Sequence, residues 1–324
     1  MSLDPAVAAV RLAVRRLADL GDTVVVACSG GVDSLALLSA TVFEGRRRDW
    51  HVVGVTVDHG MQDGSADRAA AVVAQMADMG VDETVSVSVS VESGGRGPEA
   101  AAREARYAAL GEVSGRFGGA DVLLGHTLDD QAETVLLGLT RGSGARALAG
   151  MRRDFPPFRR PLLDVTRAQT EAACRAEGIA IWSDPHNEDP RFTRSRVRHR
   201  VLPVLEEELG PGIAAALART ADLLREDASA LDSIADLVHR EVARGDALEC
   251  RRLAGEPVAV LRRVLRMAAL EAGCPAAELF RAHTLALADL VRGPAARRQV
   301  QLPGHVTAYR DGDSLRFGRT PVGG

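Results

Sequence analysis

The sequence predicts an α/β protein with a doubly wound parallel sheet, followed by a second, smaller α+β domain. Short β-branched runs alternate with segments whose apolar residues recur at helical spacing, the order that produces a parallel sheet covered on both faces. Three of these runs end in clusters of polar residues. After about residue 211, long helical stripes and short alternating segments replace this pattern, so we expect domains at residues 1–210 and 211–324.

The expected elements of the first domain follow from the spacing of apolar residues. Residues 6–20 carry Val7, Val10, Val14 and Leu17 on one face, which predicts an amphipathic opening helix. Strands are expected at residues 23–28, 51–57, 84–89, 122–124 and 179–182. Helices are expected after the first strand, at residues 65–79, from residue 98, and from about residue 128.

The second domain has a different pattern. Leu217, Leu224, Leu231 and Val238 recur every seven residues through one long helix, and two further apolar stripes predict helices near residues 258–268 and 280–290. These stripes indicate a hydrophobic core. Alternating residues with Pro-Gly and Asp-Gly turns between positions 299 and 317 predict a small antiparallel sheet.

The composition excludes several classes of protein. No apolar run approaches the roughly 18 residues of a membrane span, and the N-terminal residues lack the apolar core of a signal peptide. The 4 cysteines are scattered without a C-x-x-C pair, which argues against a disulfide framework, a zinc site or an iron–sulfur cluster. We therefore expect a cytoplasmic protein.

The stretch Ser29-Gly30-Gly31-Val32-Asp33-Ser34 joins the first strand to a helix N-terminus. Free backbone N–H groups and the positive end of the helix dipole form an anion site there, and the glycines let the backbone approach a phosphate. The two serines add hydroxyl donors, and Asp33 is suited to Mg²⁺. The alternative is a tight turn without a ligand. A Walker A loop is excluded because the chain contains no lysine.

Polar clusters at residues 29–34, 58–62 and 125–134 each follow a predicted strand. In open parallel sheets, ligands bind at the carboxyl ends of the strands. We therefore expect the three clusters to meet in one crevice, as the parts of an active site do.

Asp130 and Glu133 lie three residues apart on one face of a predicted helix. Two carboxylates at a helix start suit Mg²⁺ or an ammonium group. Their alternative is to complement the helix dipole and nothing more. Arg106 either reaches a phosphate or carboxylate or belongs, with Arg103 and Tyr107, to a solvated helix face.

Residues 141–200 are basic within an acidic chain. They hold 13 arginines and 7 acidic residues, a local charge of +6, whereas the whole chain has a net charge of −4. Five arginines between positions 191 and 200 accompany Phe192, a combination that suits phosphate contact and base stacking in RNA. The alternative is a charged surface helix paired with the acidic residues 206–208.

Several strings together resemble the tRNA(Ile)-lysidine synthase family of the N-type ATP pyrophosphatases. S-G-G-V-D-S is shared across that superfamily, and V-D-H-G-M, G-H-T-L-D-D-Q-A-E-T and D-P-H-N-E-D-P-R-F-T-R-S-R narrow the resemblance. R-R-Q-V-Q-L-P-G-H-V-T-A-Y-R resembles the family's small accessory domain. The resemblance covers nearly the whole chain. Its departures are His186 and Ser195, where Ser and Asn are expected, and Asp58, which replaces the first of two histidines.

The resemblance implies that ATP and Mg²⁺ are used to join free L-lysine to C2 of the wobble cytidine in tRNA(Ile) with anticodon CAU. An adenylated cytidine forms with release of pyrophosphate, lysine then displaces AMP, and the lysidine lets the tRNA read AUA as isoleucine. The implied ATP contacts are Ser29, Gly30, Gly31, Val32, Asp33, Ser34, Val57 and His59. The implied metal ligands are Asp33 and Asp130, and the lysine contacts are Arg106, Asp130 and Glu133. The implied catalytic residues are Asp33, His126, Asp130 and Arg198. The implied tRNA contacts are Arg141, Arg191, Arg194, Arg196 and Arg198.

Other functions fit the sequence less well. A tRNA thiolase of the same superfamily needs a sulfur-carrying cysteine or a C-x-x-C cluster. An amidating synthetase needs a glutaminase domain and leaves the arginine-rich segment without a use. A nucleotide-binding module without chemistry does not need Asp33, Asp130 and Glu133. The chain has no lysine of its own, so the reacting amine comes from outside. The oligomeric state stays open, with a homodimer as one alternative.

Overall fold

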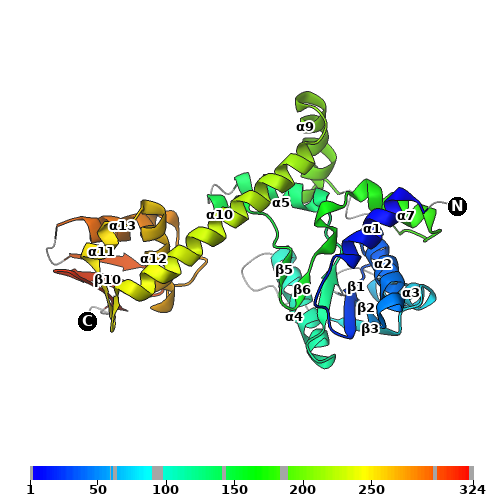
Figure 1. Ribbon diagram of the computed structural model, residues 1–324, viewed down its shortest axis with the longest axis horizontal. Helices are drawn as coiled ribbons and strands as arrows, with labels where there is room; N and C mark the ends of the chain where they lie inside the picture. The colour runs from blue at the N-terminus through cyan, green and yellow to red at the C-terminus, as the bar shows by residue number, and fades with distance from the viewer. Residues whose placement is uncertain are drawn as a thin grey trace. The chain divides into compact units, whose positions relative to one another are not determined.

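The computed structural model describes residues 3–58, 60, 64–89, 98–140, 144–182, 189–294 and 298–320 (Figure 1). The chain divides into two compact units. The first comprises Met1–Gly142 and Ala147–Ala221, and the second comprises Ser143–Arg146 and Asp222–Gly324. The main division falls within helix α10 (Ile213–Val242), C-terminal to the boundary expected at residue 210. No helix in the described ranges is both long and apolar enough to span a membrane.

A six-stranded sheet, in the order β3-β2-β1-β4-β6-β5, organises the first unit. All neighbouring pairs are parallel except β5 and β6, which form an antiparallel hairpin at one edge. The strands are β1 (Thr23–Ala27), β2 (His51–Asp58), β3 (Glu83–Ser88), β4 (Asp121–Leu124), β5 (Asp154–Phe155) and β6 (Phe158–Arg159). The predicted parallel sheet is therefore confirmed.

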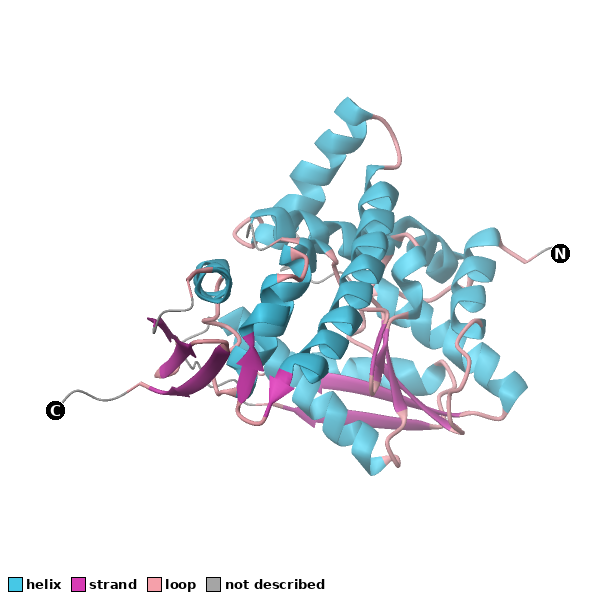
Figure 2. Ribbon diagram, turned by 60° about the vertical axis from the view of Figure 1, so that its left-hand side comes forward, coloured by secondary structure: helices cyan, strands magenta, loops and turns pink. Residues whose placement is uncertain are grey.

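Side chains of β1 alternate between two hydrophobic cores, as the two-residue period of a strand requires. Val24 and Val26 pack into one core and Val25 into the other. The first core receives α1 (Pro5–Arg15), α2 (Val32–Arg48), α3 (Ser65–Asp78) and α7 (Arg167–Ala176), and the second receives α4 (Pro98–Arg116). Helices therefore cover both faces of the sheet, as predicted, and Figure 2 shows them beside the strands.

Shorter helical elements complete the region before α10. They are α5 (Leu128–Thr140), α6 (Ala145–Leu148), the 3₁₀ helix η1 (Pro161–Asp164), α8 (Thr193–Arg196), the π-helical turn η3 (Val197–Val201) and α9 (Leu202–Leu209). Helices α8, η3 and α9 follow one another directly, and α8 and η3 carry four of the five arginines between residues 191 and 200.

The strand predicted at residues 179–182 is wrong. The N–H of Ile179 donates to the carbonyl of Cys174 at the end of α7, and the Ala180 carbonyl accepts from Gln75 of α3. Ile181 and Trp182 are 46% and 40% exposed, so their side chains are not buried in a sheet. The β5–β6 hairpin forms the sheet edge instead, and its two-residue strands are too short to give a recognisable alternation.

The second unit contains the predicted antiparallel sheet, in the order β7-β8-β11-β10-β9. Its buried core includes Leu261, Leu265, Leu287 and Leu315, which come from two helices and one strand. Besides the C-terminal part of α10, its elements are β7 (Ala243–Arg244), β8 (Ala247–Glu249), α11 (Cys250–Ala254), α12 (Val258–Glu271), α13 (Arg281–Arg292), β9 (Arg298–Leu302), β10 (Val306–Asp311) and β11 (Ser314–Arg319). The short β7–β8 hairpin was not predicted.

A buried arginine on β10 connects this sheet to helix α13. Arg310 is only 7% exposed, and its Nη1 lies 2.8 Å from the Leu290 carbonyl, 2.7 Å from that of Val291 and 2.6 Å from that of Gly293. These carbonyls belong to the end of the helix, where intrahelical donors run out and a cation is favoured by the dipole. Arg310 therefore acts as a cap for α13.

Candidate active site

The loop between β1 and α2 has the geometry of a phosphate-binding turn. Gly31 is the N-cap of α2, and no side chain caps the helix there, so its first N–H groups are open to a ligand. Gly30 has a φ of +76°, and a Cβ at this position would lie 2.7 Å from Cγ2 of Val72. Only glycine fits there without strain.

The two serines of this loop have different positions. Ser34 is buried, donates from Oγ to the Gly31 carbonyl at 2.7 Å and accepts from the N–H of Ser29 at 3.2 Å. Ser29 is exposed. Ser34 therefore holds the loop in shape, whereas the Ser29 hydroxyl is placed for an incoming anion.

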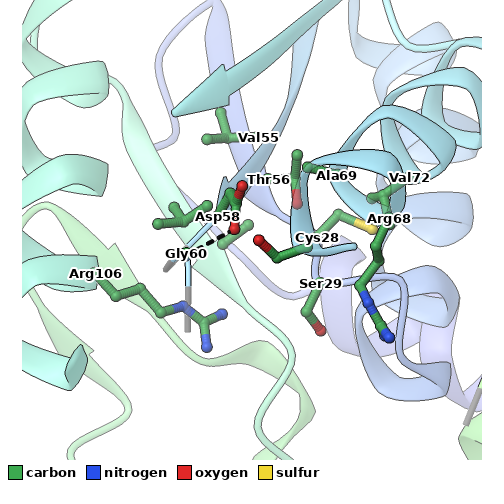
Figure 3. Close-up of a pocket in the computed structure, with 13 residues that line it drawn as sticks. Cys28, Ser29, Val55, Thr56, Asp58, Gly60, Arg68, Ala69, Val72 and Arg106 are labelled. Atoms are coloured by element: carbon green, nitrogen blue, oxygen red, sulfur yellow. Dashed lines mark hydrogen bonds between the residues drawn. The ribbon is translucent and has the colours of Figure 1, made fainter. Parts of the chain in front are cut away.

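A cavity of about 230 Å³ opens beside this loop, at the carboxyl ends of β1 and β2 (Figure 3). Val57, one of the predicted ATP contacts, lies in its wall. The lining residues are Ala27, Cys28, Ser29, Val55, Thr56, Val57, Asp58, Gly60, Ser65, Arg68, Ala69, Val72 and Arg106. Two of the three predicted polar clusters therefore share one cavity. His59 lies outside the described residues.

Arg106 of α4 enters the cavity from the side opposite Arg68 (Figure 3). Burial lowers the pKa of its guanidinium, and the nearby Arg103 lowers it further. Within the described part of the chain it forms no ion pair. A buried cation without a counter-charge is unfavourable, so Arg106 is suited to bind an anionic group of a ligand.

The third polar cluster joins the phosphate loop through one arginine. Nη2 of Arg167 lies 3.1 Å from Oδ2 of Asp33 and 3.2 Å from Oδ1 of Asp130. Asp33 also accepts a hydrogen bond of 2.5 Å from Thr170. Asp33, Asp130 and Glu133, which we call the carboxylate cluster, lie at the start of α2 and α5. The third polar cluster therefore lies beside the phosphate loop, as predicted, but these three carboxylates are not among the residues that line the cavity.

Arg194 and Arg198 of the arginine-rich segment pair with the carboxylate cluster. Their Nε atoms lie 2.7 Å and 2.6 Å from the two carboxylate oxygens of Glu133, which is fully buried. Their Nη2 atoms lie 3.3 Å and 3.1 Å from Oδ1 of Asp130. With Arg167, three guanidinium groups therefore face three carboxylates.

The pKa values of the two aspartates shift in opposite directions. Burial raises the pKa of Asp33 to about 6, although Arg167 and Thr170 act against it. Burial also disfavours the charged form of Asp130, but Arg167, Arg194 and other donors outweigh it and bring its pKa to about 2. Asp130 is thus the firmly ionised member of the pair, and Asp33 retains an electrostatic cost that a cation would relieve.

His126 is held as a neutral hydrogen-bond donor. Burial lowers its pKa to about 3, although the Asp130 charge acts in the opposite direction. Nε of Arg160 donates to Nδ1 of His126 at 3.2 Å, so the remaining proton of the neutral ring is on Nε2. The charge of Asp130 raises the pKa of this imidazole, whereas those of Arg160 and Arg106 lower it.

The other described arginines that were predicted to contact RNA, Arg191 and Arg196, have partners outside the carboxylate cluster. Arg191 is paired with Asp189 at 2.6 Å, but its side chain is 82% exposed. Arg196 donates to the carbonyls of Pro190 and Arg191 at 2.8 Å and 2.9 Å. Glu206, which the alternative interpretation pairs with this segment, instead accepts from backbone N–H groups at the start of α10. Arg141 lies outside the described residues.

Sequence reasoning assigned no role to Arg68, Arg160, Arg167 and Thr170. Arg167 did carry a signal, since it occupies the first position of α7, where the helix dipole disfavours a cation unless an anion lies nearby. Arg160 gave none, because its partners His126 and Tyr107 are distant in sequence.

Comparison with known proteins assigns both parts of the chain. A PP-loop domain model matches residues 10–205, and a TilS substrate binding domain model matches residues 248–316. The tRNA(Ile)-lysidine synthase of Thermobifida fusca is 56% identical over 93% of this chain and 94% of that protein. The enzyme of that name from Streptomyces coelicolor is 47% identical over 97% and 99%, and that from Mycobacterium tuberculosis is 50% identical over 82% of each.

Among solved structures, the U34-tRNA thiolase NcsA from Methanococcus maripaludis aligns with a TM-score of 0.55. The alignment covers 68% of this chain and 78% of that one, at 20% sequence identity. This likeness shows the fold alone.

Proposed function

We propose that this chain, which belongs to the tRNA(Ile)-lysidine synthase family, joins L-lysine to C2 of the wobble cytidine of CAU-anticodon tRNA(Ile). The PP-loop domain uses ATP. In the first step cytidine O2 forms a bond to the α-phosphate, and the bond from that phosphorus to the β-phosphate oxygen breaks, releasing pyrophosphate. In the second step the ε-amine of lysine forms a bond to C2 and loses a proton. The bond between C2 and the cytidine oxygen breaks, and this oxygen leaves as a phosphate oxygen of AMP.

The observation that carries this proposal is the single guanidinium of Arg167 between Asp33 and Asp130. It means that the phosphate loop and the carboxylates suited to an amine lie within one site. A nucleotide-binding module needs only the loop. Both parts are needed where an adenylated intermediate is made and then attacked by an amine.

The nucleotide is assigned to the cavity beside the phosphate loop. The turn at residues 29–34 holds its phosphates, and Val57, which lines the cavity, is the proposed contact for the nucleoside. His126 donates from Nε2 toward the reacting phosphate, and it is not a general base, because its pKa of about 3 leaves it a weak one. His59 and Arg141 stay predicted contacts for ATP and tRNA.

Asp33 and Asp130 fit a magnesium ion. Mg²⁺ is held in nucleotide sites by one or two carboxylates together with substrate phosphates. In the ligand-free chain the point that both carboxylates approach is occupied by Nη2 of Arg167, so a magnesium ion there requires this guanidinium to move. Burial raises the pKa of Asp33 to about 6, so its ionised form is costly in the ligand-free chain and a nearby cation would favour it. A bound Mg²⁺ supplies charge neutralisation at the phosphates.

Lysine binding at Asp130 and Glu133 requires that arginines move away first. Three guanidinium groups balance the three carboxylates, so the ligand-free cluster has no excess negative charge for an ammonium group. The tRNA backbone offers phosphates to Arg194 and Arg198, and arginine binds phosphate as well as it binds carboxylate. We therefore expect lysine to bind much more tightly when tRNA is present. Arg106 is then the partner proposed for the lysine carboxylate.

The second unit is proposed to be a tRNA-binding accessory domain. The support is the match of residues 248–316 to a substrate binding domain model. The buried leucines of its helices belong to its core, so contacts with RNA fall to its polar surface.

Nucleoside analysis by mass spectrometry tests the proposal. Full-length protein is incubated with CAU-anticodon tRNA(Ile), ATP, Mg²⁺ and lysine, and the tRNA is then digested. We expect a cytidine enlarged by lysine with loss of water, together with stoichiometric AMP and pyrophosphate. Omitting lysine should allow pyrophosphate release without the modified nucleoside. A thiolated nucleoside, or unmodified tRNA with no pyrophosphate, would contradict the proposal.

A further inference from the structure

An arginine with an unused donor lies in the wall of the nucleotide cavity. Arg68, on the first turn of α3, lines the cavity, and its Nη1 is buried without a hydrogen-bond partner in the described part of the chain. The ring of Trp182 covers the guanidinium, with Cζ 3.1 Å from the ring centroid. The N–H groups of a guanidinium point outward in its own plane, so stacking on a ring leaves them able to form hydrogen bonds. We therefore expect the missing partner of Arg68 to be an anion that lies in the plane of the guanidinium.

The position of Arg68 on α3 indicates which part of the ligand it meets. Val72 lies four residues later on the same face of the helix, and it is close to Gly30 of the phosphate loop, where a Cβ would lie 2.7 Å from its Cγ2. Figure 3 shows Arg68 beside Ser29, away from Arg106 on the opposite wall. The Arg68 guanidinium therefore borders the phosphate end of the cavity.

We propose that Arg68, held flat by Trp182, binds the β- and γ-phosphates of ATP and stabilises pyrophosphate as it leaves. The inference rests on the proposed function. When the bond between the α-phosphorus and the bridging oxygen breaks, its electron pair stays on that oxygen, and pyrophosphate gains negative charge. A positioned cation favours this charge more strongly than the ground state. The chain has no lysine for this task.

A second arginine–tryptophan stack shows what a structural pair looks like. Cζ of Arg48 lies 4.9 Å from the centroid of the Trp50 ring, and its Nη1 and Nη2 donate to the carbonyls of Leu17 and Arg15 at 3.1 Å and 2.7 Å. Both terminal nitrogens of Arg48 therefore already donate to backbone carbonyls. Arg48 is therefore a matched control that preserves the chemistry of the stack and lies outside the lining of the cavity.

Product binding tests the role of Arg68 without tRNA or lysine. Calorimetric titration of the full chain with inorganic pyrophosphate and, separately, with AMP is carried out in Mg²⁺ buffer. We expect Arg68→Gln to weaken pyrophosphate binding by about 10- to 100-fold and AMP binding by less than about 2-fold, because AMP has no β- or γ-phosphate. Arg48→Gln should change neither. Unchanged pyrophosphate affinity, or equal losses for both ligands, would overturn the inference.

Trp182 is a positioning residue, and its variants separate positioning from folding. Trp182→Leu should weaken pyrophosphate binding by about 3- to 10-fold, and Trp182→Phe should restore it, because a phenyl ring still covers the guanidinium. If Arg68→Gln does not fold, Arg68→Lys keeps the charge and loses the planar fork, and an intermediate pyrophosphate affinity is expected. Equal affinities for Arg68→Lys and the unaltered chain would contradict the proposed fork.

The outcomes also distinguish this inference from the proposed function. Lysidine formation by a chain whose Arg68→Gln variant binds pyrophosphate normally would end the inference and leave the function intact. If the unaltered chain makes no lysidine but Arg68→Gln selectively loses pyrophosphate binding, the proposed function is wrong and the inference about Arg68 stands. A loss of tRNA affinity alone would assign Arg68 to RNA and overturn its pyrophosphate role.

Discussion

Helix α2 carries two carboxylates, Asp33 and Glu44, that each contact an arginine but whose pKa values shift in opposite directions. A hydrogen-bonded Arg15 lowers the pKa of Glu44, which is 2% exposed. Burial raises the pKa of Asp33 to about 6 in spite of Arg167. At Glu44 the hydrogen bond from Arg15 outweighs burial, whereas at Asp33 burial outweighs Arg167, which Asp33 shares with Asp130. The pair at Glu44 therefore stabilises the fold, whereas ionised Asp33 has an electrostatic cost that a bound cation would reduce.

The largest effect should come from removing the charge of Asp33. Asp33→Asn should slow pyrophosphate release at least about 100-fold, because the phosphates and the metal lose a carboxylate in the site. Glu44→Gln is the control, and it should keep activity within about 2-fold. Pyrophosphate release is measured beside tRNA affinity by filter binding. A folded Asp33→Asn variant that loses tRNA binding as well would show that Asp33 is not confined to the phosphate site.

Glu133 should separate the lysine requirement from the ATP requirement. Glu133→Gln removes one charge from the proposed ammonium site, so half-saturation by lysine should rise by about 10-fold or more while that by ATP changes by less than about 2-fold. AMP release is followed with saturating tRNA while each substrate is titrated. A shift in the ATP titration alone would place Glu133 in the metal site.

The same two carboxylates of α2 should give opposite pH profiles of stability. The folded-state pKa of Asp33 is about 6, above its ordinary 3.8, so its ionisation weakens the fold as the pH rises through that range. Asp33→Asn should therefore be more stable than the unaltered chain at pH 7, by up to about 3 kcal/mol, and equal to it below about pH 4.

Glu44 should behave in the reverse way, because its folded-state pKa lies below the ordinary 4.5. Its contribution is present above that value and is lost as the pH falls. Glu44→Gln should lower the unfolding temperature by about 2–4 °C at pH 7 and by less at pH 3. Urea or thermal midpoints across this range provide the measurement. Parallel profiles for the two variants would refute the contrast.

The smallest effect concerns exposed arginines. Arg191→Ala should reduce the slope of log affinity for tRNA against log salt by about 1, because its exposed guanidinium is free to exchange Asp189 for a phosphate. Arg196→Ala is the comparison, since that side chain donates to backbone carbonyls and should change the slope less. Equal slopes for Arg191→Ala, Arg196→Ala and the unaltered chain would indicate that Arg191 and Arg196 do not contact RNA and that residues 191–200 form an ordinary charged surface.

The sequence predicted those features that depend on local pattern. The parallel strands, the phosphate turn and the meeting of residues 29–34 with residues 125–134 follow from apolar runs and from the rule for strand ends. The strand at residues 179–182 failed because a short apolar run also suits a segment lying along a helix, and Trp182 is covered by Arg68 and not by a sheet.

Pairing across the chain could not be predicted. Arg194 meets Glu133 over a separation of 61 residues, and Arg167 meets Asp33 over 134. Because the chain contains arginine and no lysine, composition does not distinguish a structural cation such as Arg48 from one in the site. Only the acceptor makes the distinction: backbone carbonyls for Arg48, carboxylates for Arg194, and none in the described residues for Arg68.

The cap that Arg310 provides has a consequence for how the second unit opens. One side chain on β10 holds the last carbonyls of α13, so fraying of that helix end exposes a buried cation belonging to the sheet. Helix end and strand therefore share one opening free energy. Hydrogen exchange of amide protons in the last turn of α13 and in β10 should therefore give the same free energy of opening, as expected for a single cooperative unit.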